Sequence, residues 1–341
     1  MDTLLDTTTL IAAPEIPGLV WRGFRGPEDY PKMLAVIDGS KQADGIQRST
    51  TVEDIARTYA HLHNCDPAQD MLFAEVDGQL VGYTRLDWET NGEGQWVGSK
   101  FAFVLPEWRR RGIGSALLRF AEMRLRQIAA ALKQRGEVPA EMPTVYASFV
   151  SSTEKDCEAL LLENGYHTER FFAEMVRPDL ENIPDLPMPQ GLEIRPVLPE
   201  HHRLIWEASN EAFHDHWGYV PDPWDGWMAW SEGPTFDPSL WRIAWEGDQI
   251  AGMVLSFIDA AQNQEYGRLR GYTENICVRR PWRKRGLAHA LIADSLRALK
   301  QRGMKEAALG VDAANISGAL QLYEQMGFRT VKHNALYQKA F

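Results

Sequence analysis

The sequence of 341 residues is poor in cysteine, with only Cys65, Cys157 and Cys277, and has no long apolar run. An odd number of widely spaced cysteines argues against a disulfide framework, and none has the spacing of a zinc site, so we expect no metal. A membrane span needs about 20 predominantly apolar residues in succession. The first residues also lack the basic start of a signal peptide. These absences favour a reduced, cytoplasmic protein with no membrane partner.

Basic charge is also scarce, because 36 Lys and Arg residues stand against 47 Asp and Glu residues and the formal net charge is −11. Phosphate backbones are bound by basic surfaces, so we expect no nucleic-acid partner. The exceptions are two basic hexapeptides, RRRGIG at 109–114 and RKRGLA at 283–288. Each follows a strand-like run and precedes an amphipathic helical pattern, which predicts that it binds a local anion.

The two hexapeptides belong to an internal repeat, in which segment 101–125 matches segment 275–299. Both segments read as a strand, a basic turn and a helix. The upstream segments of each half contain two alternating runs around Asp77-Gly78 or Gly247-Asp248, which predicts a hairpin in each half. Each half is thus predicted to run β-α-α-β-β-β-α-β-α-β.

A proline-rich stretch separates the two halves. Proline at the density found in 177–191 disfavours helices and central strands. We therefore predict an N-terminal domain over 1–178, a linker over 179–189 and a C-terminal domain over 190–341. Two domains also agree with the chain length.

The order of motifs resembles the GNAT family of acyl-CoA-dependent N-acyltransferases, once in each half. The matching pattern is Arg-x-x-Gly-x-Gly/Ala between a strand and a helix, followed by Leu322-Tyr323-Glu324-x-x-Gly327-Phe328. Two such domains in one chain also resemble the mycothiol synthase type. The resemblance implies an α/β (α+β) fold of two tandem GNAT-like domains, each a mixed, mostly antiparallel sheet flanked by helices with a splayed pair of central strands. It implies acetyl-CoA, or another acyl-CoA, as the donor.

The basic turns suit the pyrophosphate of such a donor. A helix N-terminus presents unpaired N–H groups and a partial positive charge, and glycine lets the backbone approach the phosphates. A Rossmann fingerprint fits poorly, because Leu117 stands at the position of its third glycine. Asn315 is a further candidate, although it could equally cap the following helix. The predicted cofactor-binding residues are Arg109, Arg110, Arg111, Gly112, Ile113 and Gly114, then Ile276, Cys277, Val278, Arg283, Lys284, Arg285, Gly286, Leu287, Ala288 and Asn315.

Acyl transfer to an amine needs a base for the ammonium proton and an acid for the departing thiolate. The resemblance implies Glu274 as the base and Tyr323 as the acid. A solvated carboxylate and a packed phenol are the plainer alternatives. The first half has Lys100 and Leu161 at these two positions. We therefore predict a catalytic second half and a degenerate first half that binds CoA or only packs.

The acceptor is expected near segment 204–241, which contains no Lys or Arg but many tryptophans and carboxylates. Aromatic faces with carboxylates suit a cationic amine. Packing of the two helices, or of a contact between the domains, would explain the tryptophans equally well. The candidate substrate-binding residues are Phe213, His214, His216, Trp217 and Trp227.

The sequence thus predicts an N-acetyltransferase that acts on the primary amine of a small cationic molecule, as a monomer or homodimer. Two alternatives stay open. One is a non-catalytic CoA-binding or regulatory module, and the other is an acetyltransferase for protein N-termini or lysines.

Overall fold

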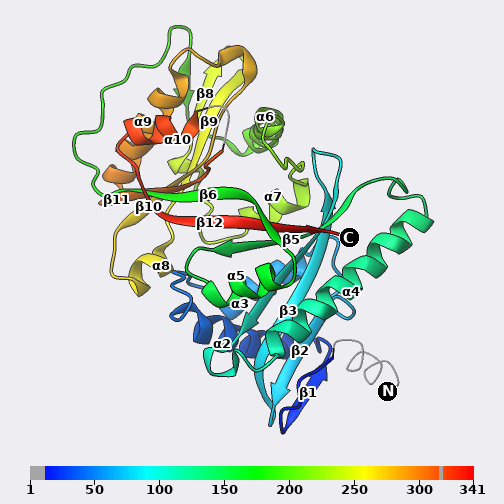
Figure 1. Ribbon diagram of the computed structural model, residues 1–341. Coiled ribbons are helices and arrows are strands. Elements are labelled where there is room, and N and C mark those ends of the chain that lie inside the picture. Colours follow the sequence, from blue (N-terminus) through cyan, green and yellow to red (C-terminus); the bar gives the residue numbers. More distant parts are fainter. Residues whose placement is uncertain (1–11, 315–317) are drawn as a thin grey trace. The chain divides into compact units, whose positions relative to one another are not determined.

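The computed structural model describes residues 12–314 and 318–341. Contacts divide the chain into two units, Met1–Glu169 with Ala335–Phe341 and Arg170–Asn334, which we call unit 1 and unit 2. Each unit has a mixed sheet flanked by helices, as Figure 1 shows. The predicted fold class is therefore confirmed.

Unit 1 has the strand order β1-β2-β3-β4-β5-β12, in which β1 to β4 pair antiparallel and β4 and β5 pair in parallel. Its long helix α4 packs on β3 and β4. The elements from its own half are β1 (Leu19–Arg22), α2 (Tyr30–Lys41), α3 (Val52–Ala60), β2 (Met71–Val76), β3 (Gln79–Thr90), β4 (Trp96–Val104), α4 (Ile113–Gln134), β5 (Thr144–Ser151) and α5 (Lys155–Glu163).

Unit 2 repeats this arrangement with the strand order β7-β8-β9-β10-β11-β6. One short helix, α8 (Ala260–Glu265), was not predicted; the Asp259 side chain caps it by accepting the Gln262 N–H at 2.8 Å. The other elements are β7 (Glu193–Arg195), α6 (His202–Phe213), α7 (Trp224–Ser231), β8 (Arg242–Glu246), β9 (Gln249–Phe257), β10 (Arg270–Val278), α9 (Leu287–Gln301), β11 (Glu306–Asp312) and α10 (Ala319–Gln325).

The last strand of each half completes the sheet of the other unit. In β6 (His167–Arg177), residues 172–177 pair antiparallel with β11. In β12 (Arg329–Ala340), the end of the strand lies next to β5, and the Phe341 N–H donates to the Thr144 carbonyl at 3.2 Å. The alternating pattern of a strand predicts its buried face but not its partner, so this exchange was not foreseen.

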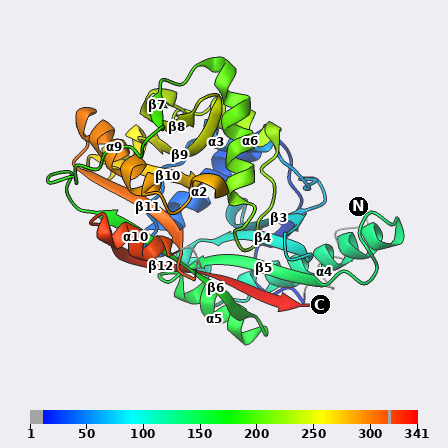
Figure 2. The same cartoon turned by 90° about the horizontal axis from the view of Figure 1, so that it is seen from above.

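Local sequence explains the elements that position the candidate site. Both predicted hairpins form, with Asp77 and Gly78 at φ +48° and +84° and Gly247 at φ +58°. Helix α9 lies against β9 and β10 (Figure 2). A Cβ on Gly271 of β10 would come within 2.5 Å of the Leu299 side chain, so glycine permits this close packing.

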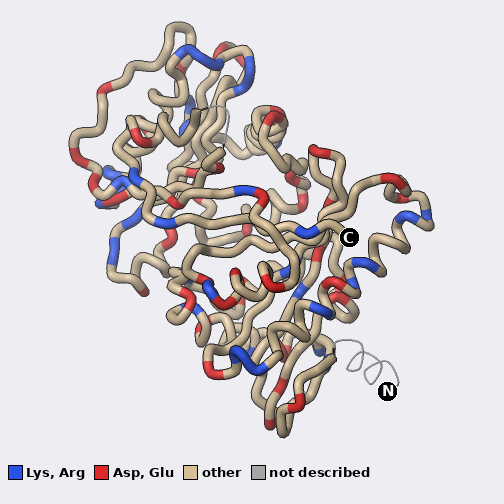
Figure 3. Tube along the Cα trace, in the orientation of Figure 1, with Lys and Arg blue, Asp and Glu red and all other residues tan. Residues whose placement is uncertain are grey.

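The proline-rich stretch forms no helix or strand from 178 to 191, as its composition predicts. It is nevertheless packed, because Leu180 is buried in the core of unit 2. The Arg177 guanidinium also donates to the carbonyls of Asp179 and Glu181, at 2.9 and 2.8 Å. Basic and acidic residues are interspersed along the chain (Figure 3). Within the described ranges, no helix is long and apolar enough to cross a membrane.

Candidate active site

The turn between β10 and α9 forms an open cradle of backbone amides. Lys284 and Gly286 have φ of +61° and +84°, and α9 begins directly afterwards at Leu287. The first helical hydrogen bond of α9 runs from the Ala290 N–H to the Gly286 carbonyl at 3.2 Å, so the preceding amides are available for a ligand. A Cβ on Gly286 would have no neighbour within 4 Å. An open, glycine-lined helix N-terminus fits the diphosphate of acetyl-CoA.

The arginine side chains of this turn are already bonded within the protein. Arg283 donates from Nε to the Val278 carbonyl at 2.9 Å and from Nη1 to Asp215 at 2.8 Å. Arg280 forms a second ion pair with Asp215, and the two arginines hold the pKa of that carboxyl below its usual range. Arg285 donates to the Gln190 carbonyl at 2.9 Å. These contacts brace the turn against β10, and its backbone amides remain the open donors.

Strands β10 and β11 separate beside this turn. They pair in parallel only over Arg270–Tyr272 and Glu306–Ala308. Beyond that point the Glu274 carboxylate accepts the Gly310 N–H at 3.2 Å, across the gap. The expected splay of the central strands is therefore present in unit 2.

A β-bulge follows Glu274. On β9 the partners step from Leu255, opposite Glu274, to Met253, opposite Cys277, so two residues of β10 face one residue of β9. Asn275, the first of the two, has φ +47°, a conformation that asparagine tolerates better than most residues. The bulge re-aims the side chains that follow it and leaves part of the ladder unpaired.

The electrostatics of Glu274 and Tyr323 suit proton transfer. Burial raises the pKa of Glu274 to about 7, although the Gly310 amide opposes the shift. Tyr323 of α10 is 7% exposed, and burial raises its pKa, with smaller contributions from Glu274 and Cys277. At neutral pH the carboxylate is poised to accept a proton and the phenol retains its own.

Cys277 does not have the properties of a nucleophile. Its side chain is buried, and burial raises the pKa of the thiol to about 12. The thiolate is the nucleophilic form, so this cysteine is unreactive at neutral pH. Asn315, the remaining predicted cofactor contact, lies outside the described residues.

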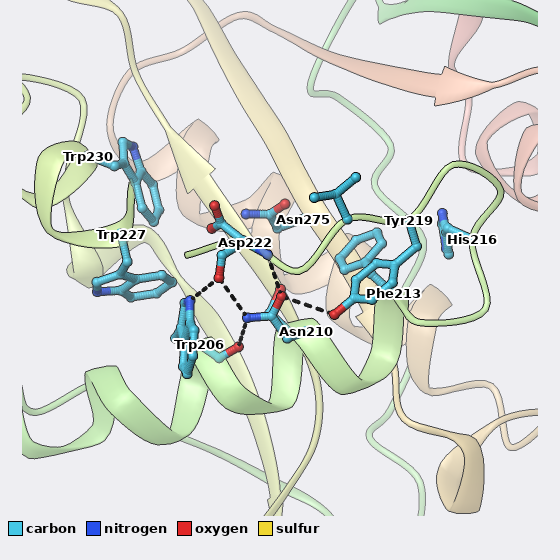
Figure 4. A pocket seen from close by; sticks show the side chains of 11 residues that line it. Trp206, Asn210, Phe213, His216, Tyr219, Asp222, Trp227, Trp230 and Asn275 are labelled. Carbon is cyan, nitrogen blue, oxygen red and sulfur yellow. Dashed lines mark hydrogen bonds between the residues drawn. The ribbon is translucent and has the colours of Figure 1, made fainter. Parts of the chain in front are cut away.

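Next to the bulge lies a pocket of about 310 Å³, shown in Figure 4. It is enclosed by α6, α7 and the loop between them, with Asn275 of β10 on one side. Of the residues that the structure describes, none that lines it is Lys or Arg. The lining residues are Trp206, Ser209, Asn210, Phe213, His216, Tyr219, Val220, Asp222, Trp227, Trp230 and Asn275.

A hydrogen-bond network around Asn210 holds the pocket loop. The Asn210 amide oxygen accepts the Asp222 N–H at 2.8 Å and the Tyr219 hydroxyl at 3.3 Å. The Trp206 indole N–H donates to the Asp222 carbonyl at 2.9 Å. These bonds leave the Asp222 carboxylate beside the aromatic rings, where burial raises its pKa. Sequence reasoning missed the part played by Asn210, which carries no motif.

The predicted substrate-binding residues divide into two groups. Phe213, His216 and Trp227 line the pocket. His214 packs on the Tyr219 ring, with the two ring centroids 5.3 Å apart. The Arg170 guanidinium carbon lies 5.0 Å from the centroid of the Trp217 ring. Neither His214 nor Trp217 is among the lining residues. Within the described ranges, no His, Cys, Asp and Glu side chains gather as a group that could hold a metal ion.

Unit 1 retains the cradle but differs from unit 2 at the positions of Glu274 and Tyr323. Arg110 and Gly112 repeat the left-handed backbone, with φ of +57° and +89°. Lys100 replaces Glu274, and its Nζ donates to the Ser148 hydroxyl at 3.2 Å. Pairing between β3 and β4 is regular, without a bulge. Leu161, at the position of Tyr323, is fully buried.

The side chains of the first hexapeptide are also bonded internally. Arg109 donates to the Val104 carbonyl at 3.0 Å and pairs with Asp44 at 2.7 Å, as Arg283 does with its own strand and Asp215. Arg110 pairs with Asp156 at 2.8 Å, and the Arg111 guanidinium lies over the Trp108 ring. This likeness shows that Arg109 and Arg283 have the same bracing position in the two units.

Comparisons with known proteins agree with this geometry. Residues 198–328 match the acetyltransferase (GNAT) family and residues 67–150 match an acetyltransferase (GNAT) domain. The chain belongs to the GNAT acetyltransferase family and carries two GNAT domains in tandem. It is an N-acetyltransferase that uses acetyl-CoA, so the predicted family, enzyme class and cofactor are confirmed.

Several relatives are similar over almost the whole chain. Mycothiol acetyltransferase of Geodermatophilus obscurus is 27% identical over 314 residues, 89% of this chain and 91% of the relative. The protein of the same name from Thermobispora bispora is 26% identical, over 92% and 97%. A GCN5-related N-acetyltransferase from Sphaerobacter thermophilus has a TM-score of 0.69 at 26% identity, over 94% and 95%. A tandem GNAT protein from the clavulanic acid biosynthesis pathway shares the fold, with a TM-score of 0.64 at 15% identity, over 94% and 98%.

Proposed function

We propose that unit 2 transfers the acetyl group of acetyl-CoA to the primary amine of a small cationic acceptor. The observation that carries the proposal is the placement of Glu274 and Tyr323 in one unit. The first spans the gap between β10 and β11 beside the amide cradle, and the second is near enough for Glu274 to raise its pKa. Unit 1 has neither side chain, which supports a single catalytic unit.

The proposed mechanism uses these two side chains as base and acid. Bound acetyl-CoA supplies the activated thioester. Glu274 takes a proton from the acceptor ammonium, whose ordinary pKa is about 10.4. Raising the carboxyl pKa from 4.5 to about 7 makes this transfer easier by about 3 kcal/mol. The neutral amine attacks the thioester carbonyl carbon, so that the N–C bond forms and the C–S bond breaks. The Tyr323 hydroxyl donates its proton to the departing sulfur, and the phenolate recovers a proton from the nitrogen of the new amide. The bulge at Asn275 orients the acceptor side of the site.

The pocket beside the bulge supports a small acceptor. Its volume of about 310 Å³ is at the lower end of ordinary ligand pockets. The Asp222 carboxylate and the faces of Trp206 and Trp230 attract an ammonium group. Because the relatives in the previous subsection are named mycothiol acetyltransferases, mycothiol without its acetyl group is the first acceptor to test.

The test measures thiol release from acetyl-CoA with a panel of acceptors. We expect turnover with small primary amines, none with the same molecules already acetylated, and none with peptides that present a lysine or an N-terminus. Turnover of peptides alone would favour a protein acetyltransferase. Binding of acetyl-CoA without turnover of any amine would contradict the proposal and favour a regulatory module.

A further inference from the structure

Unit 1 contains a cavity of about 160 Å³ that connects its cradle to a buried lysine. Gly112 and Gly114 line the cavity where α4 begins, and Lys100 and Cys157 also line it. The hexapeptide and the replaced catalytic position therefore share one space. The proposed function uses neither.

Lys100 lies where β4 and β5 separate. Their parallel pairing covers Trp96–Ser99 and Thr144–Ala147, and Lys100 is the next residue along β4. Its Nζ reaches across to Ser148 as the Glu274 carboxylate reaches across to Gly310. The repeat thus places an amine at the position where unit 2 has a base.

The environment of Lys100 favours its uncharged form. The residue is 9% exposed, and burial lowers the pKa of its ammonium. Cys157, Glu122 and Glu154 oppose that shift through their charges. A desolvated lysine with a lowered pKa is a nucleophile, as in enzymes that form covalent lysine intermediates.

The cradle in unit 1 retains the features that fit a diphosphate. The helix begins directly after Gly112, in the same left-handed conformation as Gly286. Pro14 covers one side of Gly112, since a Cβ there would come within 3.0 Å of the proline Cβ. Gly112 and Gly114 still line the cavity, which leaves space beside the start of α4 on that side.

We propose that Lys100 is an acyl acceptor, so that unit 1 acetylates itself from acetyl-CoA bound at residues 109–114. The neutral Nζ attacks the thioester carbonyl carbon, the N–C bond forms and the C–S bond breaks. The proton released from Nζ passes to the sulfur, which leaves N-acetyl-lysine and the CoA thiol. No oxidant or further reactant is needed. The amide product carries no charge and is stable, so the reaction occurs once per chain.

The experiment uses the full chain with Glu274→Gln, so that turnover in unit 2 does not consume the donor. The protein is incubated with acetyl-CoA, and acetylation of each lysine is followed by peptide mass spectrometry. Lys155, whose side chain is 73% exposed, reports uncatalysed acetylation in the same unit. We expect Lys100 to react at least about ten-fold faster than Lys155, because the cradle positions the thioester.

Two controls separate a bound donor from a merely reactive amine. S-acetyl-N-acetylcysteamine carries the thioester without the diphosphate, and we expect the preference for Lys100 to vanish with it. Excess free CoA should slow acetylation of Lys100 and leave Lys155 unchanged. As a separate check on the site of modification, the Lys100→Met variant has an uncharged side chain of similar length without the amine and should lose the acetylated peptide.

Three results would overturn the proposal. Lys100 could stay unmodified while Lys155 is acetylated, which would leave Lys100 with a structural role between β4 and β5. Lys100 could react equally well with both thioesters, which would show that the cradle does not position the donor. The acetyl group could be found on Cys157 alone, as a hydroxylamine-sensitive thioester. Each result is independent of amine turnover in unit 2.

Discussion

Unit 1 and unit 2 share a strand order and a basic turn, yet differ wherever chemistry is expected. Unit 2 has Glu274 at the strand gap, and unit 1 has Lys100. A bulge interrupts β10, whereas the pairing of β4 with β3 is regular. The comparison teaches that the fold and the cradle can be kept while the side chains proposed to transfer protons are replaced.

Each unit also has a pocket lined by aromatic residues, and the two pockets differ in charge. The pocket in unit 1, about 290 Å³ in volume, is lined by Arg48, Arg85 and Asp54 among aromatic residues, so its charged side chains sum to an excess of positive charge. The pocket in unit 2 has Asp222 and no lining cation among the residues that the structure describes. A cationic amine would be repelled in the first and attracted in the second. Electrostatics and the proposed proton transfer therefore both support the proposal that the acceptor binds in unit 2.

The largest effect is expected from Glu274→Gln, which removes the base and keeps its shape. We expect kcat/KM at neutral pH to fall by about 10² to 10⁴. In the wild type the carboxylate acts only when deprotonated, so activity should rise as pH increases through about 7. That acidic limb should be absent from the pH profile of the variant. Glu200→Gln changes the same charge at an exposed site of unit 2 and is the control; an equal loss there would remove Glu274 from the mechanism.

A smaller effect is expected from Tyr323→Phe, because water can replace the phenol as a proton donor. We expect kcat to fall by about 10²-fold, the lower end of acid catalysis, with little change in the KM for the amine. The raised pKa keeps the wild-type phenol protonated, so its activity should not decline at pH values below 10. Steady-state rates between pH 6 and 10 test both statements. An unchanged kcat would assign Tyr323 to packing alone.

The cradle can be tested with two glycines at opposite ends of α9. Gly286 and Gly303 have φ of +84° and +83°, and an added Cβ meets nothing within 4 Å at either position. Alanine should therefore cost each variant a similar 1 to 2 kcal/mol or so of stability. Only Gly286→Ala adds a methyl group to the cradle, and we expect its KM for acetyl-CoA to rise by about ten-fold. Equal KM values in the two variants would show that the turn does not bind the donor.

The sequence predicts those features that depend on residues close together in the chain. The turn at Gly286 follows from glycine, the hexapeptide and the helix pattern after it. Alignment of the two halves of the sequence also pairs Glu274 with Lys100. The bulge at Asn275 was not predictable, because it depends on how β10 pairs with β9. The same holds for the exchange of β6 and β12, since an alternating strand pattern does not specify its neighbour.

The proposed acceptor pocket lies between these cases. The tryptophans and carboxylates of segment 204–241 indicated its composition, but not which of them face the cavity. Trp217 packs against the guanidinium of Arg170, which comes from β6 and is distant in sequence. The role of Asn210 depends on its hydrogen bond to the Asp222 N–H in the loop between α6 and α7. Such roles depend on tertiary contacts, as does the pKa of Glu274, which burial sets.

The smallest effect is expected from Lys100→Glu in the Glu274→Gln background, which gives unit 1 the carboxylate that unit 2 has lost. We expect no acetyl transfer to amines above the background of Glu274→Gln. The bulge in β10 has no counterpart in β4, and Leu161 offers no proton. Arg48 and Arg85 also outweigh Asp54 in the pocket of unit 1, so that pocket disfavours a cation. Thermal unfolding shows whether the variant is folded. Recovered turnover would mean that one carboxylate is sufficient and that the bulge and the pocket charge do not decide which unit is catalytic.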